Sequence, residues 1–425
     1  MGGDFGDIPN DFDAAINGIV TSDRKTTPKT LQVKKIYQYI KMSASNLLTG
    51  KVLVKNRYDF TNLNEFNLQW TVIKDGLAVE SGNMDLPDTN PFSDIILTLP
   101  FTKTFDTASE YFLNLYVSLK QDQLWAKAGF IITSDQILLK SRPALSAVNN
   151  STGDPLTTML AGSIQTIQGK NFSTSFNKTS GIMTSLKYNG QEMINGGKGL
   201  EFSYYRSINT EIRTYSVSTI TCKSFTITPA ADPNTFRVVT SMSAVNSLGN
   251  YPYTVTYVIN STGAIDVKAS IINNGGLGSI PRIGLQMVLK SGLENVEWYG
   301  RGPQESYIDR NQAVFFGKYS NTVTGFFENY LHNKSNGNRE NIRWMTIADA
   351  TKAGLKITST GNLNFIAQHF TDQDQWKPYH EFNIWSFKRP ETYVSLDCIQ
   401  QGLDGASCGP AQLDKYKVPG NTTFS

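Results

Sequence analysis

The sequence predicts an all-β protein built from two sandwich domains. Apolar residues recur in short alternating runs, and turn signals separate these runs about every ten residues. No stretch of roughly 12 or more residues repeats with a helical period. The chain has 425 residues, which is too long for one ordinary domain.

Composition restricts the partners and the compartment. The chain has 39 basic and 36 acidic residues, a formal charge of +3, and no dense basic run, so we expect no nucleic-acid partner. No run of about 18 apolar residues occurs, which predicts no membrane partner. The first residues lack the basic and apolar regions of a signal peptide, and the prediction is a soluble chain of the cytoplasm or periplasm. Three cysteines without CxxC spacing indicate neither a disulfide framework nor a zinc site.

Residues 34–142 have the pattern of an immunoglobulin-like sandwich. Leu68 and Trp70 precede an Asp75-Gly76 hairpin signal, and an apolar run follows from Tyr111 to Val117. The segment from Trp125 to Phe130 is predicted to be a late strand of this domain.

Residues 143–160 are polar and lack periodicity, and we interpret them as a linker. The chain is β-rich over residues 161–425, where Asn189-Gly190 marks one of several hairpins. About 260 residues of antiparallel strand must pack as two large sheets, because one open sheet of that size would expose an apolar face.

Residues 1–33 are rich in Gly, Asp and Asn and contain one apolar run from Ala14 to Val20. This pattern predicts a strand followed by a loop. A (β/α)8 barrel needs about 250 residues, so this piece cannot close one.

Three motifs carry a resemblance to a known family. Gly300 to Arg310 reads GRGPQESYIDR, which resembles the Gly-x-Gly-Pro-Gln-Glu-x-Tyr-x-Asp-Arg motif of the C-terminal domain of family 2 β-galactosidases. Ser335 to Trp344 resembles the family's Glu-Asn-Gly-x-Arg-x-x-x-Arg-Trp segment, with Ser335 in place of the leading Glu. Gln400 to Pro410 resembles its closing Gly-rich loop, and Gly2 to Arg24 resembles the last strand and loop of its catalytic barrel.

This resemblance implies a remnant of the last barrel strand, an immunoglobulin-like sandwich and a galactose-mutarotase-like β-supersandwich. In family 2 enzymes both catalytic glutamates sit on earlier barrel strands, which this chain does not contain. The resemblance therefore implies the C-terminal, non-catalytic part of a β-galactosidase-like glycoside hydrolase, inactive alone and without catalytic residues. Its expected roles are carbohydrate binding and scaffolding.

The motif residues are candidate carbohydrate ligands, because sugar hydroxyls both donate and accept hydrogen bonds and suit carboxylates and guanidinium groups near aromatic rings. The alternative is that they form internal ion pairs that fix loops. The candidates are Arg301, Glu305, Tyr307, Asp309, Arg310, Asn336, Arg339, Arg343, Trp344 and Cys408.

Two further positions follow from the resemblance. Asn17 matches an asparagine at a monovalent-cation position, although the neighbouring aromatic position is Ala14. Intact family members use magnesium and sodium, but with so few oxygen ligands we expect no bound metal or other cofactor here. Cys408 replaces a tryptophan that some members place against the sugar, and a thiol has no flat face for stacking.

Other functions stay open at this point. The chain is either part of such an enzyme or a stand-alone mutarotase-like epimerase or carbohydrate-binding module. An epimerase would use His332, His369 or His380 with Glu305, Asp309 or Glu381 as acid and base. The expected partners are galactosides or other glycans, bound weakly, the missing catalytic barrel portion, and a second copy in a homo-oligomer.

Overall fold

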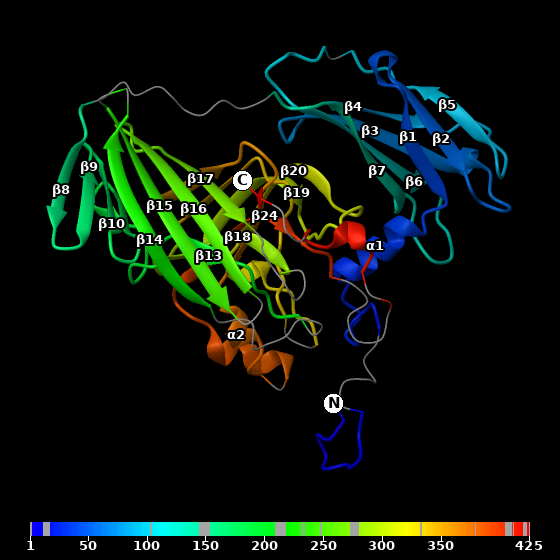
Figure 1. Cartoon of the computed structure of the whole chain (residues 1–425). Coiled ribbons are helices and arrows are strands. Elements are labelled where there is room, and N and C mark those ends of the chain that lie inside the picture. The colour runs from blue at the N-terminus through cyan, green and yellow to red at the C-terminus, as the bar shows by residue number, and fades with distance from the viewer. Residues whose placement is uncertain are drawn as a thin grey trace.

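The computed structural model describes residues 2–11, 18–102, 104–143, 154–208, 218–230, 232, 234–246, 249–272, 280–331, 334–378, 380–403, 410, 412–419 and 423–424. Figure 1 shows two β-sandwiches side by side, with an N-terminal arm below them. The predicted all-β fold, a smaller immunoglobulin-like sandwich followed by a β-supersandwich, is confirmed. In the part of the chain so described, no helix is long and apolar enough to cross a membrane.

The smaller sandwich packs a three-stranded sheet, in the order β1-β2-β5, on a four-stranded sheet, in the order β4-β3-β6-β7. Its strands are β1 (Ile40–Asn46), β2 (Lys51–Asn56), β3 (Phe66–Lys74), β4 (Leu77–Asp85), β5 (Asp94–Thr98), β6 (Tyr111–Leu119) and β7 (Ile131–Lys140).

Alternation along β3 builds the core of this sandwich. Leu68, Trp70 and Val72 point inward and are at most 4% exposed. The Asp75-Gly76 signal is confirmed as the β3–β4 turn, with φ of +47° and +85° at the two residues. A Cβ on Gly76 would lie 2.9 Å from the backbone nitrogen of Lys318 in the larger sandwich. The Lys318 N–H also donates to the Gly76 carbonyl at 3.4 Å, so the backbone of the hairpin tip contacts the larger sandwich.

Two local predictions need correction. Trp125 to Phe130 form no strand, and β7 begins only at Ile131. The chain turns at Gly129, which has φ of +83°. The turn is held by the Asp122 carboxylate, which accepts hydrogen bonds from the Ala128 N–H and the Lys127 ammonium. A helix, α1 (Pro28–Ile36), lies across the end of the segment interpreted as strand and loop. Thr27 caps α1 and Pro28 opens it.

The larger sandwich contains four sheets around one continuous apolar core, with strand orders β12-β11-β10-β9-β8, β13-β18-β24-β23, β14-β15-β16-β17-β25 and β20-β19-β21-β22. Its first strands are β8 (Thr157–Ala161), β9 (Ile164–Gln168), β10 (Phe172–Asn177), β11 (Ile182–Tyr188), β12 (Gln191–Glu192) and β13 (Glu201–Ser203). The long strands that follow are β14 (Thr219–Pro229), β15 (Thr235–Asn246), β16 (Gly249–Asn260), β17 (Ile265–Ile272) and β18 (Arg282–Leu289). The last elements are β19 (Asn295–Gly302), β20 (Phe315–Thr322), β21 (Trp344–Ala348), β22 (Gly354–Thr358), β23 (Asn364–Gln368), the short helix α2 (Asp372–Gln375), β24 (Thr392–Gln400) and β25 (Thr423–Phe424).

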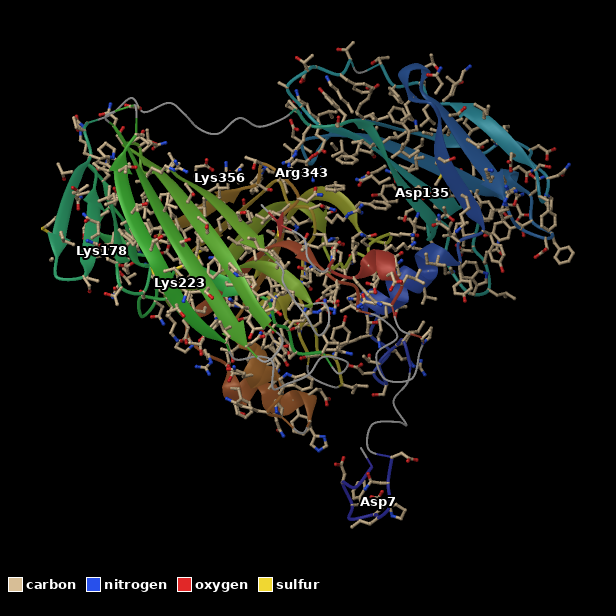
Figure 2. All side chains as sticks on the ribbon, in the orientation of Figure 1. Asp7, Asp135, Lys178, Lys223, Arg343 and Lys356 are labelled. Carbon is tan, nitrogen blue, oxygen red and sulfur yellow. The ribbon has the colours of Figure 1, made fainter. Side chains whose placement is uncertain are left out.

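The two sandwiches meet where β6 and β7 face β19 and β20. Arg343 and Asp135 both lie in this region (Figure 2). The Glu110 carboxylate accepts hydrogen bonds from Arg343 Nε at 2.9 Å, Arg343 Nη2 at 2.5 Å and Tyr299 Oη at 2.7 Å. The Gln136 carboxamide bonds both the N–H and the C=O of Phe316, at 2.7 and 2.9 Å. The interface is thus fixed by buried, charge-assisted hydrogen bonds.

Replacing Glu110 with Ala is expected to destabilise the protein by about 3 kcal/mol, because it leaves the mostly buried Arg343 guanidinium without its counter-charge. Urea unfolding followed by tryptophan fluorescence measures this loss. Lys127→Ala breaks the exposed Lys127–Asp122 pair and serves as the control, which we expect to unfold like the parent protein. An unchanged urea midpoint for Glu110→Ala would show that the domains do not depend on this ion pair.

Candidate functional site

The first motif begins inside a strand and continues into a loop. Trp298 to Gly302 form the end of β19, and Trp298 is fully buried with its indole N–H donating to the Arg301 carbonyl at 3.0 Å. Gly300 and Gly302 allow close packing, since a Cβ at Gly300 would lie 2.8 Å from the Ile342 backbone. The two glycines therefore serve close contact within a strand, and the chain leaves β19 only at Pro303.

The structure brings the two predicted motifs together. Ser306 N–H donates to the Asn338 carbonyl at 2.9 Å, and Arg301 N–H donates to the Glu340 carbonyl at 3.2 Å. The segment of residues 335–344 therefore runs beside the strand and loop of the first motif, a contact that no pattern in the sequence indicates.

Glu305 is the centre of this contact. Its side chain is 2% exposed, and the Gly337 N–H donates to Oε2 at 2.7 Å. The Arg310 guanidinium and the Tyr330 hydroxyl both donate to Oε1. Gly337 has φ of +82°, and this backbone conformation aims its N–H at the carboxylate. Both oxygens of Glu305 are thus occupied by protein groups.

Tyr307 and Arg310 complete the loop. The Arg310 guanidinium carbon lies 5.4 Å from the Tyr307 ring centroid, and Arg310 Nη1 donates to Tyr330 Oη at 3.2 Å. Tyr307 is 1% exposed, and burial raises the pKa of its hydroxyl strongly. Its oxygen has no hydrogen-bond partner within the described ranges.

Asn336 and Arg339 are also buried and paired. Asn336 accepts from the Glu328 N–H at 3.0 Å and donates to the Lys334 carbonyl at 2.8 Å. Arg339 donates to the Gly337 carbonyl at 3.0 Å, and its guanidinium carbon lies 4.7 Å from the Phe326 ring centroid. Burial lowers the pKa of Arg339 to about 10. These contacts support the alternative in which the motifs fix loops.

Other predicted residues lie elsewhere. Asp309 accepts from the Leu403 N–H at 2.7 Å and so holds the start of the closing loop. Trp344, on β21, lies beneath the ammonium groups of Lys318 and Lys356, at 5.4 and 5.6 Å from the ring centroid. Neither residue joins the Glu305 cluster.

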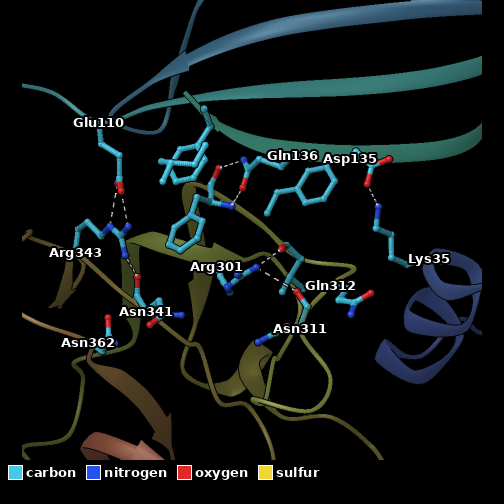
Figure 3. Close-up of a pocket in the computed structure, with 15 residues that line it drawn as sticks. Lys35, Glu110, Asp135, Gln136, Arg301, Asn311, Gln312, Asn341, Arg343 and Asn362 are labelled. Carbon is cyan, nitrogen blue, oxygen red and sulfur yellow. Dashed lines mark hydrogen bonds and ion pairs between the residues drawn. The ribbon is translucent and has the colours of Figure 1, made fainter. Parts of the chain in front are cut away.

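Arg301 and Arg343 face the boundary between the sandwiches. Arg301 Nη1 donates to the carbonyls of Asn311 and Val314 at 3.2 and 3.1 Å, and its guanidinium carbon lies 4.8 Å from the Phe316 ring centroid. The Arg343 guanidinium carbon lies 4.3 Å from the same centroid. Figure 3 shows both arginines at one groove, with Glu110 opposite Arg343.

Several predicted residues lie outside the described ranges: Asn17, Cys408 and His332. The described part of the chain contains no cluster of three or more His, Cys, Asp or Glu side chains able to hold a metal.

The remaining histidines are engaged with protein groups. His369 is buried, with Nδ1 at 2.9 Å from the Glu391 carbonyl and Nε2 at 2.7 Å from the Glu294 carboxylate. Both ring nitrogens therefore lie within hydrogen-bond distance of a protein oxygen. His380 lies 3.2 Å from Asp4 and stacks on Phe382. His369 thus has no ring nitrogen left for a sugar.

Sequence reasoning missed three residues of these clusters: Glu110, Glu328 and Tyr330. Burial, with a contribution from the nearby charge of Glu305, raises the pKa of Glu328 to about 7. The ammonium groups of Lys29 and Lys334 lie 5.9 and 5.2 Å from the Tyr330 ring centroid. No spacing in the sequence marks these residues, because each meets its partners only in the folded chain.

Glu340 makes stability depend on pH. Burial raises the pKa of this 5% exposed carboxyl from 4.5 to about 7. Between these two values the folded state binds more protons than the unfolded state, so stability falls as the pH rises from about 4.5 to 7. Glu340→Gln, which cannot ionise, is expected to recover up to about 3 kcal/mol at pH 8, since one pKa unit corresponds to about 1.4 kcal/mol.

Thermal unfolding at pH 5, 6, 7 and 8 measures this effect. The fall in melting temperature across the series should be smaller for Glu340→Gln than for the parent protein. Glu297→Gln, at an exposed position of β19, is the matched control and should keep the parent profile. Parallel profiles for Glu340→Gln and the parent protein would contradict the prediction.

Comparison with known proteins gives the family of the chain. The family model of the β-galactosidase small chain matches residues 168–425, that of β-galactosidase domain 4 matches residues 52–140, and that of the glycosyl hydrolase family 2 TIM barrel domain matches residues 1–42. Similar relatives include two β-galactosidases. That of Priestia megaterium is 29% identical, and the alignment covers 100% of this chain and 41% of the relative. That of Halalkalibacterium halodurans is 28% identical, and the alignment covers 98% of this chain and 41% of the relative. The chain thus spans about two fifths of the length of these curated relatives.

A solved galactose mutarotase-like protein from Lactobacillus casei aligns with 64% of this chain and 95% of its own, at 15% identity and a TM-score of 0.35. The family assignment rests on the sequence models. Because the small-chain model alone covers more than half of the sequence, this chain belongs to the β-galactosidase small-chain family and corresponds to the C-terminal region of family 2 β-galactosidases.

Proposed function

We propose that this chain is a non-catalytic, bracing part of a β-galactosidase, and that its two sandwiches hold the end of a catalytic barrel. The observation that supports this most strongly is the position of α1. This helix lies within residues 1–42, which match the barrel domain, and it hydrogen-bonds to both sandwiches.

Specific contacts hold α1 in place. The Lys35 ammonium donates to the Asp135 carboxylate and the Ser134 carbonyl of the smaller sandwich. On the other side, Gln32 accepts from the Ala313 N–H of the larger sandwich at 3.2 Å. Lys29 adds a cation–π contact with Tyr330, which links the helix to the Glu305 cluster. The GRGPQESYIDR loop would then support the barrel end and take no part in bond cleavage.

An acid and base pair needs one carboxyl group with a raised pKa and one that stays ionised. In the large domain, Glu328 and Glu305 come near this arrangement, because the pKa of Glu328 is raised to about 7 and Glu305 is ion-paired with Arg310. A retaining glycosidase needs one carboxylate free to attack the sugar. Glu305 is 2% exposed, and Arg310, Tyr330 and the Gly337 N–H occupy its oxygens. This geometry favours bracing over hydrolysis.

The purified chain is expected to release no nitrophenol from o-nitrophenyl β-galactoside above the rate in buffer. The measurement is absorbance over hours at several protein concentrations, with the Priestia megaterium β-galactosidase as the positive control. A rate that scales with the chain's concentration, survives a second purification and falls in Glu328→Gln would overturn the non-catalytic assignment.

Asp135→Ala is expected to loosen α1, because Lys35 loses its buried counter-charge and the N–H of Met42 loses its acceptor at 3.2 Å. Limited digestion with trypsin, which cuts after Lys29, Lys34 and Lys35, should cleave the helix at least about fivefold faster in this variant. Asp122→Ala removes an exposed ion pair and is the control. Equal cleavage rates in folded Asp135→Ala and the parent protein would show that Asp135 does not hold the helix.

A further inference from the structure

Strand β8 leaves one edge of the five-stranded sheet open. The strand order is β12-β11-β10-β9-β8, so β8 pairs with β9 on one side and with no described strand on the other. All residues of β8 are exposed, and the apolar side chains of Met159 and Leu160 are 63% and 55% exposed. Because neighbouring residues of a strand point to opposite faces, β8 presents an apolar side chain on each face as well as an unpaired backbone edge.

The backbone groups along this edge follow a defined pattern. A two-residue turn joins β8 to β9, and Ala161 pairs with Ile164 across it. The residues that flank such a turn bond each other, and alternate residues of the strand then direct their backbone groups away from the partner strand. Thr158 and Leu160 therefore direct their N–H and C=O groups outward. No other strand of the described chain pairs with them.

Edge strands elsewhere in the protein are protected against pairing, whereas β8 is not. Natural proteins block free edges with charged residues, prolines, bulges or covering segments. Every other edge strand of at least three residues in the described chain contains a charged residue, except β23. For example, β14 contains Lys223 and a bulge, and β5 contains Asp94. The free edge of β23 is covered, because Arg339 forms a β-bridge with Phe365. β8 has the sequence TTMLA and none of these protections.

The surface around this edge is also uncharged. β8, β9 and β10 contain no charged residue, although the whole chain has 39 basic and 36 acidic residues. Lys170, between β9 and β10, is paired with Asp154 at 3.7 Å. A two-fold contact brings the charges near its axis close to their own kind, and like charges on facing strands destabilise a pairing. A second copy can therefore approach β8 without this repulsion.

The segment that matches the barrel domain lies far from β8. Figure 1 shows β8 at the end of the larger sandwich, on the side away from the smaller sandwich, α1 and the N-terminal arm. Residues 1–42 are the part that matches the barrel model. A barrel that includes this segment is therefore not expected to cover β8, which favours a second copy of the chain as its partner.

From these observations we propose that two copies of this chain pair through β8, antiparallel about a two-fold axis at Met159, so that their five-stranded sheets become one continuous sheet. Thr158 of each copy then lies opposite Leu160 of the other, and their outward backbone groups exchange hydrogen bonds. The two Met159 residues meet at the axis as a non-hydrogen-bonded pair, with Cα atoms about 4.5 Å apart. This dimer goes beyond the bracing role and does not depend on it.

Sedimentation equilibrium of the whole chain, at concentrations from micromolar to millimolar, measures the dimer. A contact through one short strand buries less than the ~1,200 Å² of a stable complex, so we expect a dissociation constant on the order of 100 µM. Met159→Lys should weaken the dimer at least about tenfold, because two ammonium groups would face each other at the axis. Its melting temperature should not change, since Met159 is exposed.

Ile96→Lys is the matched control for this variant. Ile96 is an apolar residue of edge strand β5 in the smaller sandwich and is 54% exposed, so the substitution adds the same charge to a comparable position. This control should dimerise like the parent protein.

Oxidative cross-linking tests the register of the pairing independently. Met159→Cys, treated with copper phenanthroline, should form a covalent dimer, because the expected Cα distance at the axis lies within the range of disulfides. Thr157→Cys is the register control. In the proposed pairing residue 157 lies opposite residue 161, so its two copies are roughly 13 Å apart along the strands and should not cross-link. The parent protein, with its own three cysteines, gives the background on non-reducing gels.

A chain that stays monomeric at millimolar concentration would refute the proposal, and so would a dimer that Met159→Lys leaves unchanged. Equal cross-linking of Met159→Cys and Thr157→Cys would refute it as well, since that result would indicate random encounters. The nitrophenol assay and the trypsin digestion do not depend on any of these outcomes, so the dimer and the bracing role fail separately.

Discussion

The arrangement of the two sandwiches depends on the buried carboxylate of Glu110. It lies just before β6 and accepts hydrogen bonds from Arg343 and Tyr299 across the interface. Two charges that are removed from water stabilise a structure only when their geometry is good and their remaining hydrogen bonds are satisfied, and both conditions hold here. The same ion pair forms one end of the groove, so the interface and the groove have a common origin.

A second buried carboxylate, Glu305, organises the larger sandwich in a similar way. It joins the loop after β19 to the segment of residues 334–343 through Arg310, Tyr330 and Gly337. These charge-assisted hydrogen bonds hold the two segments in one conformation. Since Lys29 of α1 lies against Tyr330, the stability of these loops is coupled to the docking of the N-terminal helix.

Local chemistry made much of the fold predictable. The Asp75-Gly76 and Asn189-Gly190 turns are confirmed because both residues of each pair adopt the positive φ that such hairpins require. The helix α1 was missed because nine residues show little apolar periodicity, although Thr27 and Pro28 are good signals for a helix start. The pairing of Glu110 with Arg343, 233 residues apart, has no signal in a single sequence. Motif residues could be named, but whether they face solvent or one another depends on the packing of distant strands.

Gly76 also constrains how this chain can diverge over evolution. Apolar residues in either core can exchange for others of similar volume, because each sandwich can repack by itself. The tip of the β3–β4 hairpin has no such freedom, since any side chain at this position would meet the Lys318 backbone and the Tyr299 ring. A lineage that loses this glycine must widen the angle between its domains, and the shape of the space between them would change without any substitution in its walls.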